Sequence, residues 1–357
     1  MNPIDYRREV TRALESFGDI LQRLNPWVFS VLLVTVMLLK DGIGFFYVFD
    51  PAVISSEFPL PLEGTNAGSF GWPLIAWALQ LETYRGLWLL PLLVILATAL
   101  VFSPVLSRRF DRPTAFSIAV VLLLGPIPMS LLSHLGRHDF LVLIGGVVLA
   151  LSLRQPILAV LATVVMSSGN PEQSLVATLL LLLAVIALKL THLRAAAAWA
   201  TGVAAVYWLG VLLILRNLDR PSRLESLAAV APDFTRITVQ NLPVLIWATY
   251  GLSTFALLTL IISSRRWNRI ILIGAASAPI LLYFLGDQSR IGIAAATPII
   301  VLATVLVVRQ LMDSLNPQRR SIALASITSA AIVLPTVHIL YLGDIYAPYR
   351  FLVDILF

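Results

Sequence analysis

Long apolar runs, separated by short polar clusters, dominate the chain from residue 27 to residue 342. The runs are nearly continuous Leu, Val, Ile and Ala rather than alternating apolar and polar positions. They therefore predict helices in lipid and not the strands of an outer-membrane barrel. A membrane-spanning helix needs roughly 20 apolar residues. On this length we expect an all-α, polytopic transmembrane helical bundle of about eleven spans, at residues 27–48, 88–106, 116–133, 139–153, 156–168, 174–191, 195–215, 242–263, 270–286, 291–308 and 321–342.

Residues 1–26 follow a different pattern, with arginines placed around a regular apolar stripe. The stripe consists of Tyr6, Val10, Leu14, Phe17, Leu21 and Leu24. This spacing predicts an amphipathic juxtamembrane helix that lies on the cytoplasmic membrane surface. The segment lacks the apolar core of a cleavable signal peptide. Residues 27–357 are expected to form a single transmembrane domain without a soluble domain.

Basic residues gather in alternate loops, and this asymmetry predicts the orientation of the bundle. The short loops at 107–113 and 263–269 are rich in arginine, which marks cytoplasmic loops. We therefore expect a cytoplasmic N-terminus and, with an odd number of spans, a C-terminus outside. The long segments 49–87 and 216–241 then lie on the outer side. The first of them contains an apolar helix from Trp72 to Leu81, which suits the membrane interface.

The composition agrees with a multi-pass membrane protein. Hydrophobic residues make up 59% of the chain and charged residues 12%, with a mean hydropathy of +0.90. These values lie outside the range of soluble domains. The absence of cysteine excludes disulfides and thiolate chemistry. The net charge of +6 reflects topology-setting arginines and does not indicate nucleic-acid binding. No spacing of His, Asp and Glu indicates a dedicated metal site, so no cofactor is predicted, and a divalent metal stays open as an alternative without support from the residues.

Four polar clusters lie at the predicted outer helix ends: Lys40-Asp41-Gly42, Gly136-Arg137-His138-Asp139, Asn170-Pro171-Glu172-Gln173 and Gly286-Asp287-Gln288-Ser289-Arg290. Ionisable groups near a membrane span indicate function by default. Asp41 is the candidate catalytic residue, because a carboxylate in this position can act as a general base. The alternative is that Lys40 and Asp41 are interfacial residues that end a short helix.

The other clusters supply candidate substrate-binding residues. Arg137 and His138 are expected to face the aqueous entrance, where the planar guanidinium suits a phosphate group. His138 is alternatively a solvated side chain. Asp139 lies at the start of the predicted span, where a carboxylate stabilises the helix dipole. Glu172 follows Pro171 at a helix start, which favours a capping role for Glu172.

Asp287 and Arg290 lie in a tight hairpin between two helices rich in Ala and Gly. The hairpin is too short to bury charges, so we expect both side chains to remain partly hydrated. Four polar residues between apolar runs are typical of a turn. Arg290 also opens a helix, and the backbone N–H groups there favour anions.

The pattern resembles the GT-C superfamily of membrane glycosyltransferases. An acidic residue at the end of the first span, followed by a long outer loop with interfacial helices, is similar to that superfamily. The segment Gly136 to Leu143 resembles its "G-x-x-D and Leu-rich span" element. The first loop carries no Asp-Glu or Asp-x-Asp pair, which is a departure from the family pattern.

The resemblance implies transfer of a sugar from a polyprenyl-phosphate donor to an acceptor on the outer face of a plasma (inner) membrane. Asp41 would be the base, and Arg137, His138 or Arg290 would hold the lipid phosphate. Two alternatives stay open: a transporter or flippase for a lipid-linked or small polar substrate, and a non-catalytic subunit of an envelope polysaccharide assembly. A transporter would favour ionisable groups near the bilayer midplane, whereas here they lie at helix ends.

Overall fold

A computed structural model describes residues 3–44, 68–81, 83–133, 135, 137–221, 242–282, 288–339 and 345–346. Asp287 and the segments 45–67 and 222–241 lie outside these residues, so the predictions made for them are not addressed by the structure.

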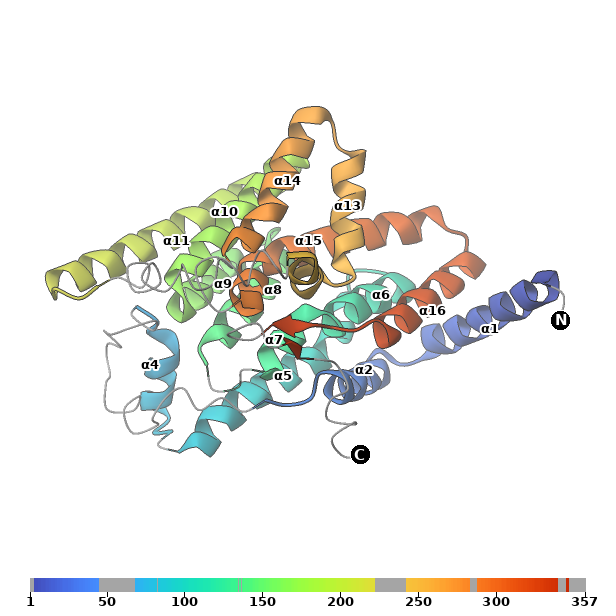
Figure 1. Cartoon of the computed structure of the whole chain (residues 1–357), viewed down its shortest axis with the longest axis horizontal. Coiled ribbons are helices and arrows are strands. Elements are labelled where there is room, and N and C mark those ends of the chain that lie inside the picture. Colours follow the sequence, from blue (N-terminus) through green and yellow to red (C-terminus); the bar gives the residue numbers. More distant parts are fainter. Residues whose placement is uncertain are drawn as a thin grey trace.

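The described chain is almost entirely helical (Figure 1). Two short strands, β1 and β2, pair in antiparallel fashion after the last helix. The elements are α1 (Pro3–Arg23), α2 (Pro26–Asp41), α4 (Gly71–Ala78), α5 (Tyr84–Ser107), α6 (Arg112–Leu123), α7 (Pro126–Ser133), α8 (Asp139–Ser152), α9 (Pro156–Gly169), α10 (Pro171–Ala187), α11 (Thr191–Asn217), the helix Leu242–Tyr250, α13 (Ser253–Ser263), α14 (Arg266–Leu281), α15 (Gln288–Ser314), α16 (Pro317–Val333), β1 (His338–Ile339) and β2 (Ile345–Tyr346).

Several of these helices can cross a membrane. Among the described residues, α5, α11 and α15 are long and apolar enough for one crossing each, and the number rises to six if each of three bent pairs forms one span. Helices α8, α9 and α10 are apolar but shorter. The protein is therefore a helical membrane protein with several spans, as the apolar runs predict. Every predicted range contains a helix, although α2 ends at Asp41 and not at residue 48.

Two predicted spans are broken. The range 116–133 bends by 42° between α6 and α7, where Pro126 removes a backbone donor and crowds the preceding turn. The range 242–263 bends by 97° between Tyr250 and Ser253. Gly251 has φ +48° at this bend, a conformation that glycine adopts more readily than residues with a Cβ atom. A continuous apolar run reveals a span but not such a break.

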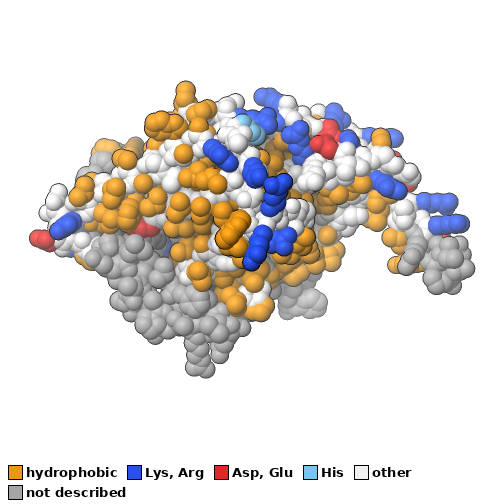
Figure 2. Space-filling view, turned by 90° about the horizontal axis from the view of Figure 1, so that it is seen from above, with side chains coloured by type: hydrophobic (Ala, Val, Ile, Leu, Met, Phe, Trp, Pro, Cys, Tyr) orange, Lys and Arg blue, Asp and Glu red, His pale blue; other side chains and the backbone are white. Residues whose placement is uncertain are grey.

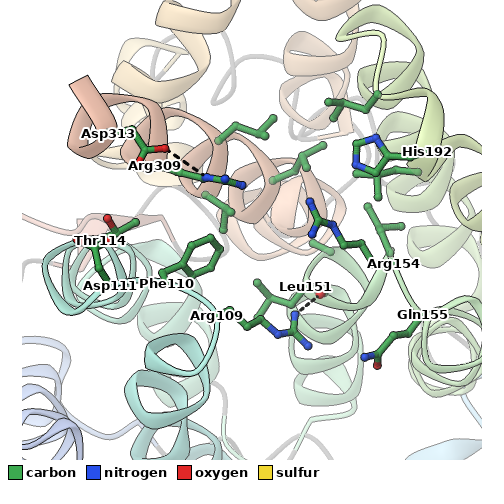
Figure 3. A pocket seen from close by; sticks show the side chains of 17 residues that line it. Arg109, Phe110, Asp111, Thr114, Leu151, Arg154, Gln155, His192, Arg309 and Asp313 are labelled. Atoms are coloured by element: carbon green, nitrogen blue, oxygen red, sulfur yellow. Dashed lines mark hydrogen bonds and ion pairs between the residues drawn. The ribbon is translucent and has the colours of Figure 1, made fainter. Parts of the chain in front are cut away.

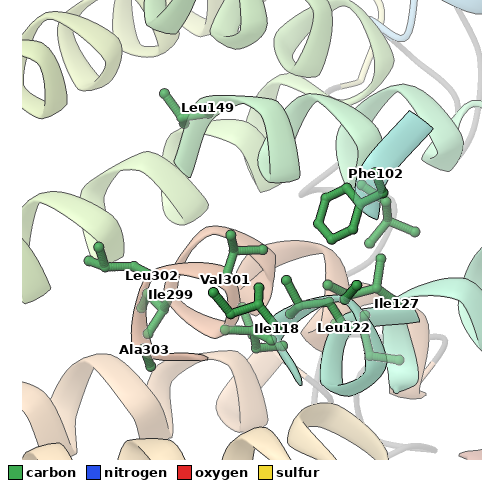
Figure 4. Packing of buried hydrophobic residues seen from close by; sticks show 14 of the residues in the cluster. Phe102, Ile118, Leu122, Ile127, Leu149, Ile299, Val301, Leu302 and Ala303 are labelled. Carbon is green, nitrogen blue, oxygen red and sulfur yellow. The ribbon is translucent and has the colours of Figure 1, made fainter. Parts of the chain in front are cut away.

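Helix α15 is the centre of the bundle. It packs against α6, α7, α8, α10, α13 and α14. In the apolar stretch of α15 that is long enough to cross a membrane, 83% of the residues are buried. The corresponding shares are 33% for α5 and 22% for α11. Ile299, Val301 and Leu302 of this helix belong to the same core cluster as Ile118 and Leu122 of α6 (Figure 4). A helix that is apolar on all sides is buried on all sides, which is the situation of α15.

Two adjacent glycines place α8 between α9 and α15. A Cβ atom on Gly145 would lie 2.5 Å from Met166 Cγ of α9, and one on Gly146 would lie 3.0 Å from Thr297 Cγ2 of α15. Small residues let helix backbones approach closely within a membrane, where packing takes over from the hydrophobic effect. The glycine pair therefore brings neighbouring helices against two faces of α8.

Helix α11 shows how the surface meets lipid. Its buried face is lined mainly by alanines, such as Ala197, Ala200 and Ala204, whereas Trp199 and Val206 are 67% and 72% exposed. Large apolar side chains that point outward suit a hydrocarbon environment, because they would be costly in water. Hydrophobic side chains likewise cover much of the face seen in Figure 2, on either side of a band of Lys and Arg side chains.

Helix α1 is amphipathic as predicted, but it also docks on α16. Ser321 Oγ donates a hydrogen bond to Asp19 Oδ1 at 2.5 Å and accepts one from Gln22 Nε2. Leu21 is buried, whereas Tyr6 is 60% exposed. Only part of the apolar stripe therefore meets protein, which leaves the rest for the membrane surface.

The contact between α1 and α16 can be tested at Gly18. A Cβ atom there would lie 2.0 Å from the backbone oxygen of Ser321, so Gly18→Ala forces the two helices apart. We expect the variant to lose about 1–3 kcal/mol of stability, as for other overpacked contacts. Thermal unfolding in detergent measures the effect. The matched control is Gly202→Ala on α11, where nothing lies within 4 Å. Equal melting temperatures for the two variants would contradict the docking.

Candidate functional site

The polar residues of the bundle separate into two ends. One end, here called the basic end, contains Arg109, Arg154, His192 and Arg309, which line one cavity. The other, here called the mixed-charge end, contains Asp139, Arg290 and the start of α10. Helices α8 and α15 both run from the mixed-charge end to the basic end. The predicted division between arginine-rich loops and mixed polar clusters is therefore present in the fold.

Arginines at the basic end satisfy the carbonyl groups left over at helix C-termini. Arg109 Nη1 donates to Leu151 O at 2.7 Å, near the end of α8. Arg269 donates to the carbonyls of Ile261, Ile262 and Ser264 at the end of α13. The last four carbonyls of a helix have no intrahelical partner, and basic side chains complement their negative charge. These residues thus stabilise helix ends besides biasing orientation.

At the mixed-charge end, Asp139 and Arg290 form a buried ion pair. Arg290 Nη1 contacts Asp139 Oδ2, and the two residues are 4% and 3% exposed, respectively. The expectation that Arg290 remains hydrated is therefore wrong. The short hairpin does not isolate Arg290, because the start of α15 lies inside the bundle against the start of α8. Arg290 is paired with Asp139, a residue 151 positions earlier in the chain.

The register of α8 and α15 explains this pairing. Gly146 lies seven residues after Asp139, and Thr297 lies seven residues after Arg290. Gly146 packs against Thr297, and Asp139 contacts Arg290, so the two helices run parallel and in step for about two turns. The glycine contact thereby fixes the height at which the two charges meet.

His138 lies beside this pair and is also buried. Its Nε2 atom is 3.8 Å from Asp139 Oδ1, and the residue is 2% exposed. His138 therefore does not face an aqueous entrance, contrary to the expectation from the sequence. The reason is the close approach of α9, since a Cβ atom on Gly169 would lie 3.1 Å from His138 O. Arg137 is only partly buried and is the more accessible of the two.

Helix α4 covers the start of α8. The ring of Trp72 meets Phe140, the residue after Asp139, edge to face at 5.2 Å between ring centroids. Trp72 is 1% exposed, whereas Trp77 on the opposite side of α4 is 47% exposed. The helix predicted from Trp72 onward thus exists, and one face of it shields the buried charges from solvent.

Lys40 joins three helices at the same end. Its Nζ atom donates to Leu124 O at 3.0 Å and to Ala331 O. Leu124 lies at the break between α6 and α7, and Ala331 lies in the last turn of α16. A broken helix exposes backbone groups that must find partners inside the protein. The buried ammonium of Lys40 supplies a donor to the carbonyl at this break.

Asp41, the candidate base, is buried and hydrogen-bonded. Thr336 Oγ1 donates to Asp41 Oδ1 at 3.0 Å, and the residue is 9% exposed. Asp41 Oδ2 has no hydrogen-bond partner among the residues that the structure describes. The neighbouring segment is held in place by Trp247, whose Nε1 atom donates to Pro335 O at 2.7 Å. One carboxylate oxygen is therefore held by Thr336, and the other is buried without a hydrogen-bond partner in the described part of the chain.

A backbone bridge connects Asp41 to the start of α8. The Gly44 N–H group donates to Leu132 O at 2.8 Å, and the Leu135 N–H group donates to Gly44 O at 3.3 Å. Gly44 follows Asp41 by three residues, and Leu135 precedes His138 by three. The first polar cluster and the Arg137–Asp139 cluster therefore belong to one continuous region.

The start of α10 completes the mixed-charge end. Asn170 Oδ1 accepts a hydrogen bond from Gln173 N at 3.1 Å and so caps the helix, with Pro171 in the first turn. Glu172 lies in the first turn beside this cap. Asn170 Nδ2 and Gln173 Oε1 are buried and have no hydrogen-bond partner within the described part of the chain. They are further groups that a polar ligand would satisfy.

No protein-family model matches the sequence of this chain, and neither the curated proteins nor the solved structures contain a significant match.

The structure thus unites most of the predicted site residues. Arg137, His138, Asp139, Glu172 and Arg290 lie at the ends of packed helices, and Asp41 is linked to them through Gly44. Sequence reasoning missed Thr336, the helix-capping role of Asn170 and the shielding by Trp72. The Asn-Pro pair was a recognisable capping signal. Within the described residues, no group of three or more His, Asp and Glu could hold a metal ion.

The pairing of Asp139 with Arg290 can be tested through the stability of three variants. Asp139→Asn leaves the Arg290 charge buried without its counter-charge, which should cost about 3–5 kcal/mol. Arg290→Met leaves the Asp139 carboxylate buried without its counter-charge and should cost a similar amount of folding stability. The double variant Asp139→Leu with Arg290→Met removes both charges and should regain most of the lost stability. Melting temperatures of the three variants in detergent measure this. If the double variant lost as much stability as the two single variants added together, the two residues would not act as a pair.

Proposed function

We propose that the protein is a membrane glycosyltransferase of the GT-C type, which transfers a sugar from a polyprenyl-phosphate-linked donor to an acceptor at the outer face of the plasma membrane. The observation that carries the proposal is the buried carboxylate of Asp41, one oxygen of which is held by Thr336 while the other has no partner among the described residues. Such a group is suited to accept the proton of an attacking hydroxyl.

In the proposed reaction the acceptor hydroxyl attacks the anomeric carbon of the donor sugar. Asp41 Oδ2 takes the hydroxyl proton, the new glycosidic bond forms, and the polyprenyl phosphate leaves with the electron pair of the broken bond. The partly exposed Arg137 is the proposed contact for the phosphate, because a guanidinium can bind phosphate oxygens in bidentate fashion. The buried pair of Asp139 and Arg290 would hold the start of α8, next to Arg137, in place. Glu172 would lie at the edge of the site.

Two features of the chain support the outer location of this site. The basic end carries the loops rich in arginine, which face the cytoplasm in most membrane proteins. Helices α8 and α15 both run from the mixed-charge end to the basic end, which is the direction that the predicted topology with a cytoplasmic N-terminus gives to each of them. The mixed-charge end would then face outward, where lipid-linked donors present their sugars.

A transporter or flippase is the second candidate, and one observation favours it. Helix α6 breaks before α7, and the buried Lys40 binds the carbonyl of Leu124 at this break. Transporters often place binding sites at discontinuous helices. The Lys40 contact is equally explained as structural support, because it satisfies carbonyl groups of two helix ends.

The orientation can be tested by cysteine labelling, since the chain contains no cysteine. Thr83 and Ser314 are both exposed and lie at opposite ends of the bundle. We expect Thr83→Cys to react with a membrane-impermeant thiol reagent in intact cells. Ser314→Cys should react only after the membrane is permeabilised. The reverse pattern would place the mixed-charge end in the cytoplasm and remove the basis for an outer site.

The proposed base is tested by Asp41→Asn, which keeps the shape and the Thr336 contact but no longer accepts a proton near neutral pH. We expect sugar transfer from a panel of polyprenyl-phosphate sugars to fall by about 100-fold or more, the usual effect of losing a general base. The matched control is Asp313→Asn, an exposed carboxylate at the basic end.

The same purified proteins, placed in liposomes, can be assayed for lipid-linked sugar translocation. Translocation without sugar transfer would favour the flippase. Full transfer activity in Asp41→Asn would exclude Asp41 as the base.

A further inference from the structure

The basic end contains a large cavity that the proposed reaction does not use. Its volume is about 770 Å³, and it is lined by the connections α5–α6, α8–α9 and α10–α11 together with the last turns of α15. Figure 3 shows Arg109, Arg154, His192 and Arg309 arranged around this cavity. The side chains come from four separate parts of the chain, so the fold gathers them.

The cavity has a surplus of positive charge. Arg309 pairs with Asp313 at 3.5 Å, and Asp111 pairs with Arg320 at 3.2 Å. Both aspartates that line the cavity are thus already matched by an arginine. Arg109 and Arg154 have no carboxylate partner within the described part of the chain, and the hydrogen bond of Arg109 goes to a neutral carbonyl. An anion would find two guanidinium groups available.

Two further features favour a ligand with an oxyanion. The residues before α6, α9 and α11, namely Asp111, Gln155 and Leu190, all line the cavity, and none of them caps its helix with a side-chain hydrogen bond. Helix N-termini carry partial positive charge and unsatisfied N–H groups. Thr114 in the cavity wall is 1% exposed, and its hydroxyl has no hydrogen-bond partner among the described residues.

Part of the cavity wall is apolar. Leu302, Val305 and Leu306 of α15 line it together with Leu151 and Leu193. A soluble phosphate would gain nothing from this wall. A lipid would place its phosphate among the arginines and the first methylene groups of its acyl chains against the leucines. Basic pockets between membrane helices are established binding sites for anionic lipid head groups.

We propose that this cavity binds the phosphate head group of an anionic phospholipid. Arg109 and Arg154 contact the phosphate oxygens, and the leucine wall of α15 contacts the acyl chains. The site lies at the opposite end of the bundle from Asp41 and does not depend on the proposed sugar transfer.

Binding of phosphatidylglycerol to the purified protein in detergent, measured by native mass spectrometry, tests the proposal. Phosphatidylcholine carries the same acyl chains and phosphate without the net charge and serves as the lipid control. We expect Arg154→Gln to weaken phosphatidylglycerol binding by about tenfold, the effect of losing one charge-assisted contact. Arg109→Gln should have a comparable effect. Added salt should weaken binding by the wild type, because it screens exposed charges.

The control variant is Arg266→Gln, an exposed arginine of the predicted cytoplasmic side that does not line the cavity. It should bind phosphatidylglycerol as the wild type does. The proposal would be overturned if Arg154→Gln and Arg266→Gln weakened phosphatidylglycerol binding equally. It would also be overturned if the wild type bound phosphatidylglycerol and phosphatidylcholine equally well. Glycerol phosphate is the soluble probe. If it competed with an affinity equal to that of the lipid, the lipid assignment would be wrong.

Discussion

The buried ion pair between Asp139 and Arg290 determines how the central helix sits among its neighbours. Two charges removed from water lose several kcal/mol each in hydration, and they regain it only when their geometry is close and shielded. The glycines of α8 allow that geometry by letting α15 approach. Trp72 provides part of the shielding. Because α15 contacts six other helices, the height at which this pair meets affects the packing at the centre of the bundle.

The two ends of the bundle use charge in different ways. At the basic end, arginines are mostly exposed and bind helix carbonyls or exposed carboxylates, so each contact contributes little on its own. At the mixed-charge end, Lys40, Asp41, His138, Asp139 and Arg290 are all buried. Buried ionisable groups are costly and persist in membrane proteins chiefly where they hold structure or perform a function. This contrast supports the proposal that the mixed-charge end carries the reaction.

Local patterns predicted the helices, whereas the contacts between distant residues could not be predicted. The apolar runs located every described span, and Pro171 and Trp72 marked helix starts correctly. Arg290 was expected to be hydrated because its surroundings in sequence are a short hairpin. Its partner lies 151 residues away, and the partner of Asp41 lies 295 residues away. The docking of α1 on α16 likewise could not be predicted, because an apolar stripe fits a lipid surface and a protein surface equally well.

Lys40 and Asp41 are adjacent in α2, yet both hold the same short stretch at the end of α16. Lys40 binds the carbonyl of Ala331, and Asp41 binds the hydroxyl of Thr336. The end of α2 is therefore tied to residues 331–336 by two buried side-chain hydrogen bonds. Any motion that widens access to Asp41 along this side must carry the end of α16 with it or release the Lys40 ammonium from its carbonyls. The same ammonium also binds the carbonyl of Leu124, so the end of α2 is tied to the break between α6 and α7 as well.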